Sequence, residues 1–373
     1  MRLGIGLGME ASVQTSTGSA SDPLSFEDWK TLEEMANEQG LLGVMLDGVE
    51  KLPREHRPEK KAIIQSIGQL IRSEQQYAMQ EHAATKMALL LHQHGIRTYV
   101  LKGAVVAECY PKPEHRRSID MDCFLGNDEA CSKFEASASM EVEEDVWERG
   151  NRVLEEQGFE VRRDFYKNST IVLPGLTVEN HRYFTPFRGN KRLKRLEKLL
   201  QSLLKEDRSA SDVDSRRFDG SWLYRPPMMA SALFLIEHAY SHFLHEGLTW
   251  RLVLDWMMFC RKHRQELDWQ ELESMVDEFG FRRFYDSYVR LGKYLLGELP
   301  VGGLQPNDVL MLDDIWSPLD LHETVTGLKG KLALAGNTWR ARWKYRLFTD
   351  MSWMKALWIQ AKGVVLERDV RLE

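Results

Sequence analysis

Two acidic residues, one position apart inside an apolar run, constrain the fold more than any other feature of the sequence. Asp120 and Asp122 lie in the run from 119 to 125, whose other members are all apolar. Because residues i and i+2 of a β-strand point to the same face, we expect a strand with both carboxylates on one side. Neighbouring carboxylates at the end of a buried strand repel each other and favour a bound divalent cation. A pair of solvated acids on an edge strand is the alternative.

A second feature precedes this strand. Residues 96–101 predict a short buried strand, Lys102 and Gly103 predict a turn, and residues 104–110 are compatible with a helix. A helix that begins directly after a glycine turn presents unpaired N–H groups to an anion. We therefore expect phosphate binding at Lys102 and Gly103, with an ordinary surface lysine as the alternative interpretation of Lys102.

Length, charge and cysteine usage limit the class of protein. A chain of 373 residues favours two domains, or one domain with a helical extension. The net charge of −6 argues against a surface built for long nucleic acids. No run approaches the roughly 18 apolar residues of a membrane-spanning helix. The four cysteines show no metal-finger spacing, so we expect free thiols in a cytoplasmic protein.

Helical and strand patterns alternate along the chain. Helices are expected from Ser25 onward, and a long one over 60–94 should end at the capping glycine Gly95. Residues 126–128 predict a turn, and the polar insert 137–145 predicts a surface loop. Three short strands are then expected over 159–163, 169–173 and 176–184.

The overall prediction is an α+β fold in which a small mixed sheet is followed by helices. Its expected parts are a flexible leader (1–24), a sheet-containing domain with N-terminal helices (25–205), a linker loop (206–220) and an all-helical domain (221–373).

The last expected strand carries a further candidate for the site. Its alternation puts Thr177, Glu179 and His181 on one face. Glu179 is therefore a candidate third carboxylate for a metal site.

The order of strand, Lys-Gly turn, helix, Tyr-Pro, Arg and Asp-x-Asp strand resembles the uncharacterised nucleotidyltransferase family of the DNA polymerase beta-like superfamily. The resemblance spans about 26–260. It implies transfer of a nucleoside monophosphate from a nucleoside triphosphate to an unknown acceptor hydroxyl, with Mg²⁺ or Mn²⁺ held by Asp120, Asp122 and Glu179. In the resembled family a histidine follows the third acid by two positions, as His181 does here.

The resemblance also suggests which residues bind the substrates. The superfamily usually has Gly-Ser where this chain has Lys102 and Gly103, so an ammonium group replaces a hydroxyl at the phosphate. Arg116 and Arg117 precede the Asp-x-Asp strand, where a guanidinium could hold a phosphate or form a structural ion pair. Both alternatives remain open for both arginines.

The helical half contains a second pattern of the resembled family. His238 and His242 share a helix face, but Ala239 stands where a zinc protease would need glutamate. The resembled family has His-x-x-x-His followed by Arg and Asp on the next helix. This pattern implies a substrate cleft, or a braced domain interface, formed by His181, His238, His242, Arg251 and Asp255.

Two other functional classes remain as alternatives: a non-catalytic nucleotide-binding or regulatory module, and a helical interaction protein. The interaction protein would use the tryptophan-rich segment 339–366, for which we expect docking onto the protein through aromatic anchors rather than a membrane-surface helix. For the enzyme, a small-molecule acceptor is favoured over a long nucleic acid because the net charge is acidic.

Overall fold

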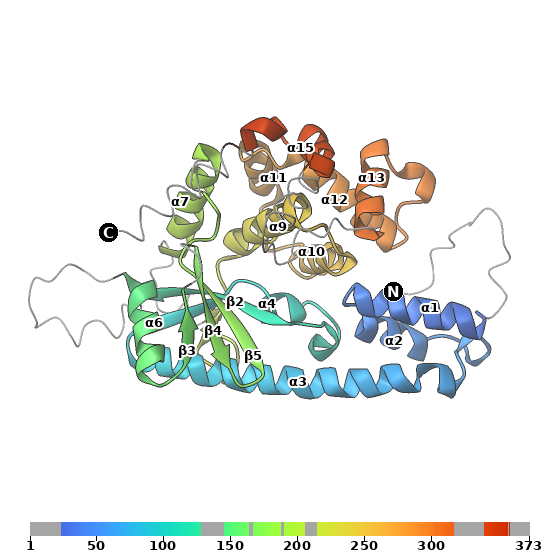
Figure 1. The fold of residues 1–373 in the computed structure, drawn as a ribbon, viewed down its shortest axis with the longest axis horizontal. Helices are drawn as coiled ribbons and strands as arrows, with labels where there is room; N and C mark the ends of the chain where they lie inside the picture. The colour runs from blue at the N-terminus through green and yellow to red at the C-terminus, as the bar shows by residue number, and fades with distance from the viewer. Residues whose placement is uncertain are drawn as a thin grey trace, which may run out of the picture.

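A mixed β-sheet separates one long helix from a bundle of helices (Figure 1). The computed structural model describes residues 24–127, 145–163, 167–187, 190–205, 215–316, 339–356 and 358. Within these residues the expected α+β class is confirmed. The expected leader up to residue 23, most of the polar insert and most of the linker loop lie outside the described residues.

Helices flank both faces of the sheet. The N-terminal part contains α1 (Phe26–Glu38), α2 (Leu42–Glu50), η1 (Arg54–His56), α3 (Lys60–Gln93), α4 (Ala104–Ala107), η2 (Pro113–His115), α6 (Val146–Glu156) and α7 (Lys191–Lys205). The C-terminal part contains α9 (Met228–His245), α10 (Trp250–Lys262), α11 (Trp269–Glu278), α12 (Arg282–Leu295), η3 (Val301–Gly303), α13 (Pro306–Trp316) and α15 (Arg342–Phe348).

The six strands follow the order β3-β4-β5-β2-β1-β6. They are β1 (Ile96–Val100), β2 (Asp120–Asn127), β3 (Glu160–Arg162), β4 (Asn168–Leu173), β5 (Leu176–His181) and β6 (Leu223–Tyr224). The pairs β2–β5 and β1–β6 are parallel, and the other neighbours are antiparallel. The parallel pairing of β2 with β5 places Asp122 opposite Glu179.

Several predicted boundaries differ from the observed ones. Strand β2 continues through the expected turn, because Gly126 and Asn127 pair with β1. The expected helix 104–110 is reduced to α4, since Pro111 disfavours helical backbone at the residue before it. Residues 223–224 are expected in the all-helical part, but they form β6 and complete the sheet. The sequence does not reveal this strand, because two residues are too few to show the alternation of polar and apolar side chains.

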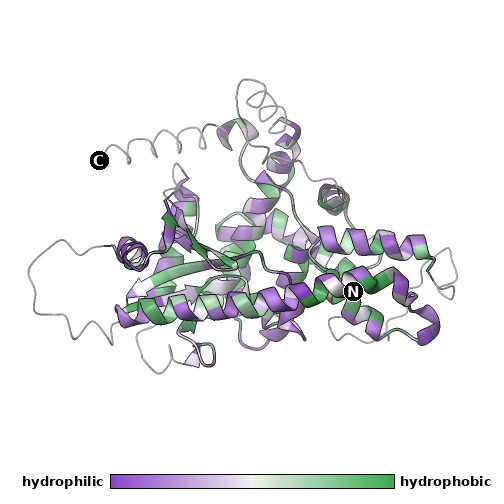
Figure 2. Ribbon diagram, turned by 60° about the horizontal axis from the view of Figure 1, so that its bottom comes forward, coloured by the Kyte–Doolittle hydropathy of each residue, from purple (hydrophilic) through white to green (hydrophobic). Residues whose placement is uncertain are grey.

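The two faces of the sheet pack against different partners. Met121 and Cys123 point toward α3 and belong to a core cluster with Met87. Figure 2, which brings α3 forward, shows polar and apolar residues alternating along it, as a helix with one buried side requires. On the opposite face Phe124 stacks on Phe184 at a centroid distance of 4.5 Å, and this face packs against α9.

In the described part of the tryptophan-rich segment (339–356 and 358), α15 packs against α9, in line with the expected docking. Trp343 contacts Phe243 edge to face, and the buried ammonium group of Lys344 lies 2.8 Å from Asp314 and donates to the carbonyl oxygen of Phe243. Trp339 in the same segment remains 53% exposed. No helix in the described ranges is both long and apolar enough to cross a membrane.

Helix α2 packs closely against η2, which precedes β2 in the chain. The buried carboxylate of Asp47 accepts from Lys112 at 2.6 Å and contacts the Nδ1 atom of His115 at 2.7 Å. Gly43 makes this approach possible, because a Cβ atom there would lie 2.6 Å from the carbonyl oxygen of His115.

Gly43→Ala should therefore lower the free energy of unfolding by about 1–3 kcal/mol, since backbone must move to admit the methyl group. Urea unfolding of the full chain measures the change. Gly68→Ala in α3 is the matched control: its Cβ would meet only Arg72 Nη1, at 3.9 Å. The control should gain about 0.5–1 kcal/mol from helix propensity. Equal stability of the two variants would contradict close packing at Gly43.

Candidate functional site

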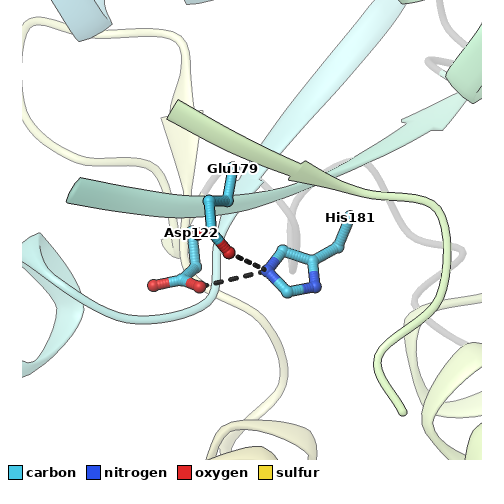
Figure 3. Close-up of side chains that lie close together, drawn as sticks. All are labelled: Asp122, Glu179 and His181. Carbon is cyan, nitrogen blue, oxygen red and sulfur yellow. Dashed lines mark hydrogen bonds and ion pairs between the residues drawn. The ribbon is translucent and has the colours of Figure 1, made fainter. Parts of the chain in front are cut away.

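Three side chains meet where β2 and β5 run side by side (Figure 3). The Nε2 atom of His181 lies 3.0 Å from Asp122 Oδ1 and 3.7 Å from Glu179 Oε2. One potential ligand atom from each residue lies within 4.8 Å of the others. Asp122 is buried, whereas the Glu179 side chain is 39% exposed. The cluster is therefore accessible from the glutamate side.

Lys102 contacts the same cluster from the end of β1. The backbone N–H of Leu101 donates to the carbonyl oxygen of Asp122 at 2.9 Å, which brings Lys102 alongside. Its Nζ atom lies 3.0 Å from Asp122 Oδ2 and 2.6 Å from the Nε2 atom of His238 on α9. The contact with Asp122 is an ion pair without hydrogen-bond geometry, so Oδ2 accepts no hydrogen bond. Lys102 thus links the sheet to the helical half.

Burial and neighbouring charges shift the pKa values of Asp122, His238 and Glu179. Burial alone would raise the pKa of Asp122, but Lys102 and His181 outweigh it and hold that pKa well below its usual range. Burial and the charge of Lys102 lower the pKa of His238, so its neutral ring accepts from the ammonium group. Burial and the Asp122 carboxylate raise the pKa of Glu179.

The two carboxylates fit a divalent cation. Asp122 Oδ2 has a lone pair that no hydrogen bond uses, and Glu179 is partly exposed beside it. Carboxylate oxygens suit Mg²⁺ and Mn²⁺. His181 fits better as a positioning group, because its Nε2–H donates to Asp122 and cannot bind a metal while it carries that proton.

Asp120 does not belong to the three-residue cluster found among the described residues. It opens β2 opposite Thr177, and its backbone carbonyl accepts from the Ser118 hydroxyl at 2.9 Å. Its negative charge is close enough to contribute to the raised pKa of Glu179. Metal binding by Asp120 stays a prediction.

Asn168 is a residue of the site that the sequence pattern did not indicate, because it lies one position before the strand expected over 169–173. Asn168 begins β4 and pairs with His181, and its Nδ2 atom donates to Glu179 Oε2 at 3.3 Å. It therefore orients the more exposed carboxylate of the cluster. The sequence offers no local signal for this role, because the contact depends on the register between β4 and β5.

The two arginines before β2 have different environments. Arg116 is buried and forms a bidentate pair with Asp255 at 2.9 and 2.7 Å, and Tyr110 donates to the same carboxylate at 2.8 Å. The structural ion pair, one of the two alternatives, is thus present for Arg116. Arg117 is exposed, and its backbone carbonyl accepts from Arg251 at 3.1 Å. Phosphate binding by either arginine stays a prediction.

The two histidines of α9 lie on one face, with ring centroids 4.4 Å apart. Only His238 contacts Lys102, whereas His242 pairs with Glu246 at 2.6 Å. The cluster of potential metal ligands in the described part of the chain does not include them. His238 therefore lies at the cluster, and Asp255 lies at the contact between α10 and the segment before β2.

Comparison with known proteins gives one match. A family model described as an uncharacterised nucleotidyltransferase matches residues 25–136 and 140–297. No curated protein and no solved structure matches the chain. The matched ranges contain every site residue expected from the sequence, from Lys102 to Asp255.

Lys102→Met should destabilise the protein by about 3–5 kcal/mol at neutral pH, because it leaves the buried charge of Asp122 without its partner. The depressed pKa of Asp122 adds stability above its unfolded pKa, and this is lost as pH falls through the folded pKa. In the variant the pKa of Asp122 is less depressed, because only His181 then opposes the effect of burial, so the deficit should shrink as the pH falls toward the ordinary carboxylate range.

Urea unfolding at neutral and mildly acidic pH tests this expectation. Lys61→Met is the matched control, because the Lys61–Glu59 pair is solvent-exposed and should contribute nothing measurable. A pH-independent deficit for Lys102→Met would show that the loss does not arise from the charge of Asp122.

The pKa of Glu179 is raised above the ordinary value of 4.5. Mn²⁺ binding should weaken as the pH falls through this raised pKa, because protonated Glu179 cannot bind the ion. The electron paramagnetic resonance signal of free Mn²⁺ measures binding between about pH 5 and about pH 8. Glu179→Gln should remove this pH step. Glu160→Gln on the exposed edge of the same sheet should keep it. An unchanged profile in Glu179→Gln would exclude Glu179 as a ligand.

Proposed function

Because the chain belongs to the uncharacterised nucleotidyltransferase family, we propose that it transfers a nucleoside monophosphate from a nucleoside triphosphate to an acceptor hydroxyl. The observation that carries the proposal is the placement of Asp122 and Glu179 side by side on paired parallel strands, within reach of His181. A Mg²⁺ or Mn²⁺ ion at these carboxylates, with Asp120 as a further ligand, would neutralise phosphate charge and acidify the acceptor hydroxyl.

In the proposed reaction the acceptor oxygen forms a bond to the α-phosphorus, and pyrophosphate leaves as the bond to its bridging oxygen breaks. Glu179 is suited to take the acceptor proton, because its raised pKa makes it a stronger base than an ordinary glutamate. Asn168 donates to Glu179 Oε2 and so restricts the orientation of this carboxylate. His181 does the same for Asp122.

Lys102 would exchange partners when substrates bind. Its ammonium group lies 3.0 Å from Asp122, which a divalent cation would also need. Displaced from the carboxylate, the ammonium group would pair with triphosphate oxygens, while His238 stays neutral beside it. Gly103 adopts φ +75°, a conformation that lets the chain turn directly after Lys102.

The ion pair of Lys102 with Asp122 also supports a second candidate function, nucleotide binding without turnover. In that case the ammonium group of Lys102 would stay paired with Asp122 and no divalent cation would be needed.

For the enzyme we propose a small-molecule acceptor, in line with the acidic net charge. We also propose a cytoplasmic location, which the free thiols of Cys109, Cys123 and Cys260 support.

The test is transfer of label from α-phosphate-labelled ATP, CTP, GTP or UTP to acceptors in a cell extract, with Mg²⁺ or Mn²⁺ present. Glu179→Gln should lower the rate by about 100-fold or more, because it removes a metal ligand and a base. Glu160→Gln makes the same chemical change outside the cluster, so this control variant should transfer label at the rate of the original protein.

Three outcomes separate the candidates. Label transfer that depends on Glu179 supports the enzyme. Triphosphate binding without transfer, unchanged in Glu179→Gln, supports the non-catalytic candidate. Neither binding nor transfer with any of the four triphosphates would contradict both.

A further inference from the structure

A hollow in the protein surface lies next to α15, which Figure 1 shows on the side of the helical half that faces away from the sheet. It has a volume of about 850 Å³ and is lined by residues of the stretch 339–354 and by Arg283 on α12. The lining contains no member of the cluster of Asp122, Glu179 and His181. The hollow and the candidate site are therefore in different parts of the molecule.

The hollow has mainly positive charge. Its charged lining residues are four arginines and one aspartate: Arg283, Arg340, Arg342, Arg346 and Asp350. The Asp350 carboxylate already lies 3.2 Å from Arg192 and 4.0 Å from Arg283. The other three arginines are exposed and form no ion pair with any residue that the structure describes. A chain with a net charge of −6 thus carries a local positive surface here.

The same segment exposes large apolar side chains. Trp339, Met354 and Trp358 are 53%, 74% and 63% exposed. Other side chains attach the segment to α9, since Trp343 contacts Phe243 edge to face. Docking therefore leaves three large apolar groups in contact with solvent. Exposed apolar groups gathered in one place mark surfaces that bind a protein or a membrane.

The surroundings of Trp339 distinguish between partners. The guanidinium group of Arg342 lies over the Trp339 ring, 4.4 Å from its centroid, and Trp353 meets that ring edge to face at 5.2 Å. Single-stranded nucleic acids stack their bases on open aromatic faces, whereas this ring already contacts both residues. The headgroup region of a bilayer accepts tryptophan and arginine side by side, because indole prefers the interface and guanidinium binds lipid phosphate.

The arginine–tryptophan surface consists of the exposed side chains just described: Trp339, Arg340, Arg342, Arg346, Met354 and Trp358. We propose that this surface binds an anionic lipid bilayer. The apolar side chains lie at the boundary between headgroups and acyl chains, and the arginines lie at the lipid phosphates. Charge complementarity orients the protein, because an anionic bilayer attracts this surface and repels the acidic remainder of the chain. The proposal does not require the chain to transfer nucleotides.

Co-sedimentation of the full chain with lipid vesicles tests the proposal. The two probes are vesicles of phosphatidylcholine alone and vesicles with equal parts of phosphatidylcholine and phosphatidylglycerol. The protein should bind the anionic vesicles at least about 10-fold more tightly, because each arginine near an anionic bilayer adds about 5-fold to the affinity. Equal affinity for the two kinds of vesicle, or no binding to either, would overturn the proposal. Binding of a single-stranded oligonucleotide without vesicle binding would assign the surface to nucleic acid instead.

An arginine double variant locates the contact. Arg340→Gln combined with Arg346→Gln should weaken binding to the anionic vesicles by about 25-fold, which is two losses of about 5-fold. Arg152→Gln combined with Arg162→Gln is the matched control, because it removes two equally exposed charges from α6 and β3. The control should bind like the original protein. An equal loss in both double variants would show that net charge alone determines binding and would overturn the proposal.

A tryptophan variant tests the apolar part of the contact. Trp339→Ala should weaken vesicle binding several-fold, whereas Trp316→Ala on α13, also partly exposed at 44%, should not. Urea unfolding of both variants shows whether they remain folded. A folded Trp339→Ala variant that binds like the original protein would overturn the placement of this ring in the bilayer. Because the vesicle assay contains neither nucleotide nor metal, its result is independent of whether nucleotidyl transfer occurs.

Discussion

The ammonium group of Lys102 makes the buried polar contact on which the arrangement of the two halves depends. It touches Asp122 on β2 and His238 on α9, so one side chain joins the sheet to the helical half. A buried lysine is stable only with such partners, because desolvation disfavours its charge. Arg116 makes a second connection of the same kind through Asp255 on α10. Both connections use residues that also belong to the proposed substrate region, so structural and functional roles overlap there.

Local patterns predicted the strand elements of the site because alternation depends only on neighbouring residues. The alternation within the two strands predicted one shared face for Glu179 and His181 and a face of β2 for Asp122, and the structure brings these three side chains together. Their meeting depends on the parallel pairing of two strands distant in the sequence, which no local pattern encodes. For the same reason the pairing of Asn168 with His181 was not foreseen.

The predicted metal ligands were Asp120, Asp122 and Glu179, whereas the cluster in the structure contains His181 in place of Asp120. This difference follows from the positions of the residues along their strands. Asp120 is at the first residue of β2, where it is opposite Thr177, whereas Asp122 is opposite Glu179. The sequence could show that the two aspartates share a face, but it could not show which of them would be nearest to the glutamate. Helix positions were easier to predict, since long amphipathic segments such as α3 carry many repeats of the same pattern.

Strand β6 has a consequence for how the chain can be divided. It follows α7 in the sequence but forms the outermost strand of the sheet, against β1. A fragment that ended after α7 would leave the backbone groups of Thr98 and Tyr99 without their partners and would offer an open strand edge to other chains. The sheet therefore takes its last strand from the segment that leads into the helical half, and a shortened version of this protein would be prone to self-association.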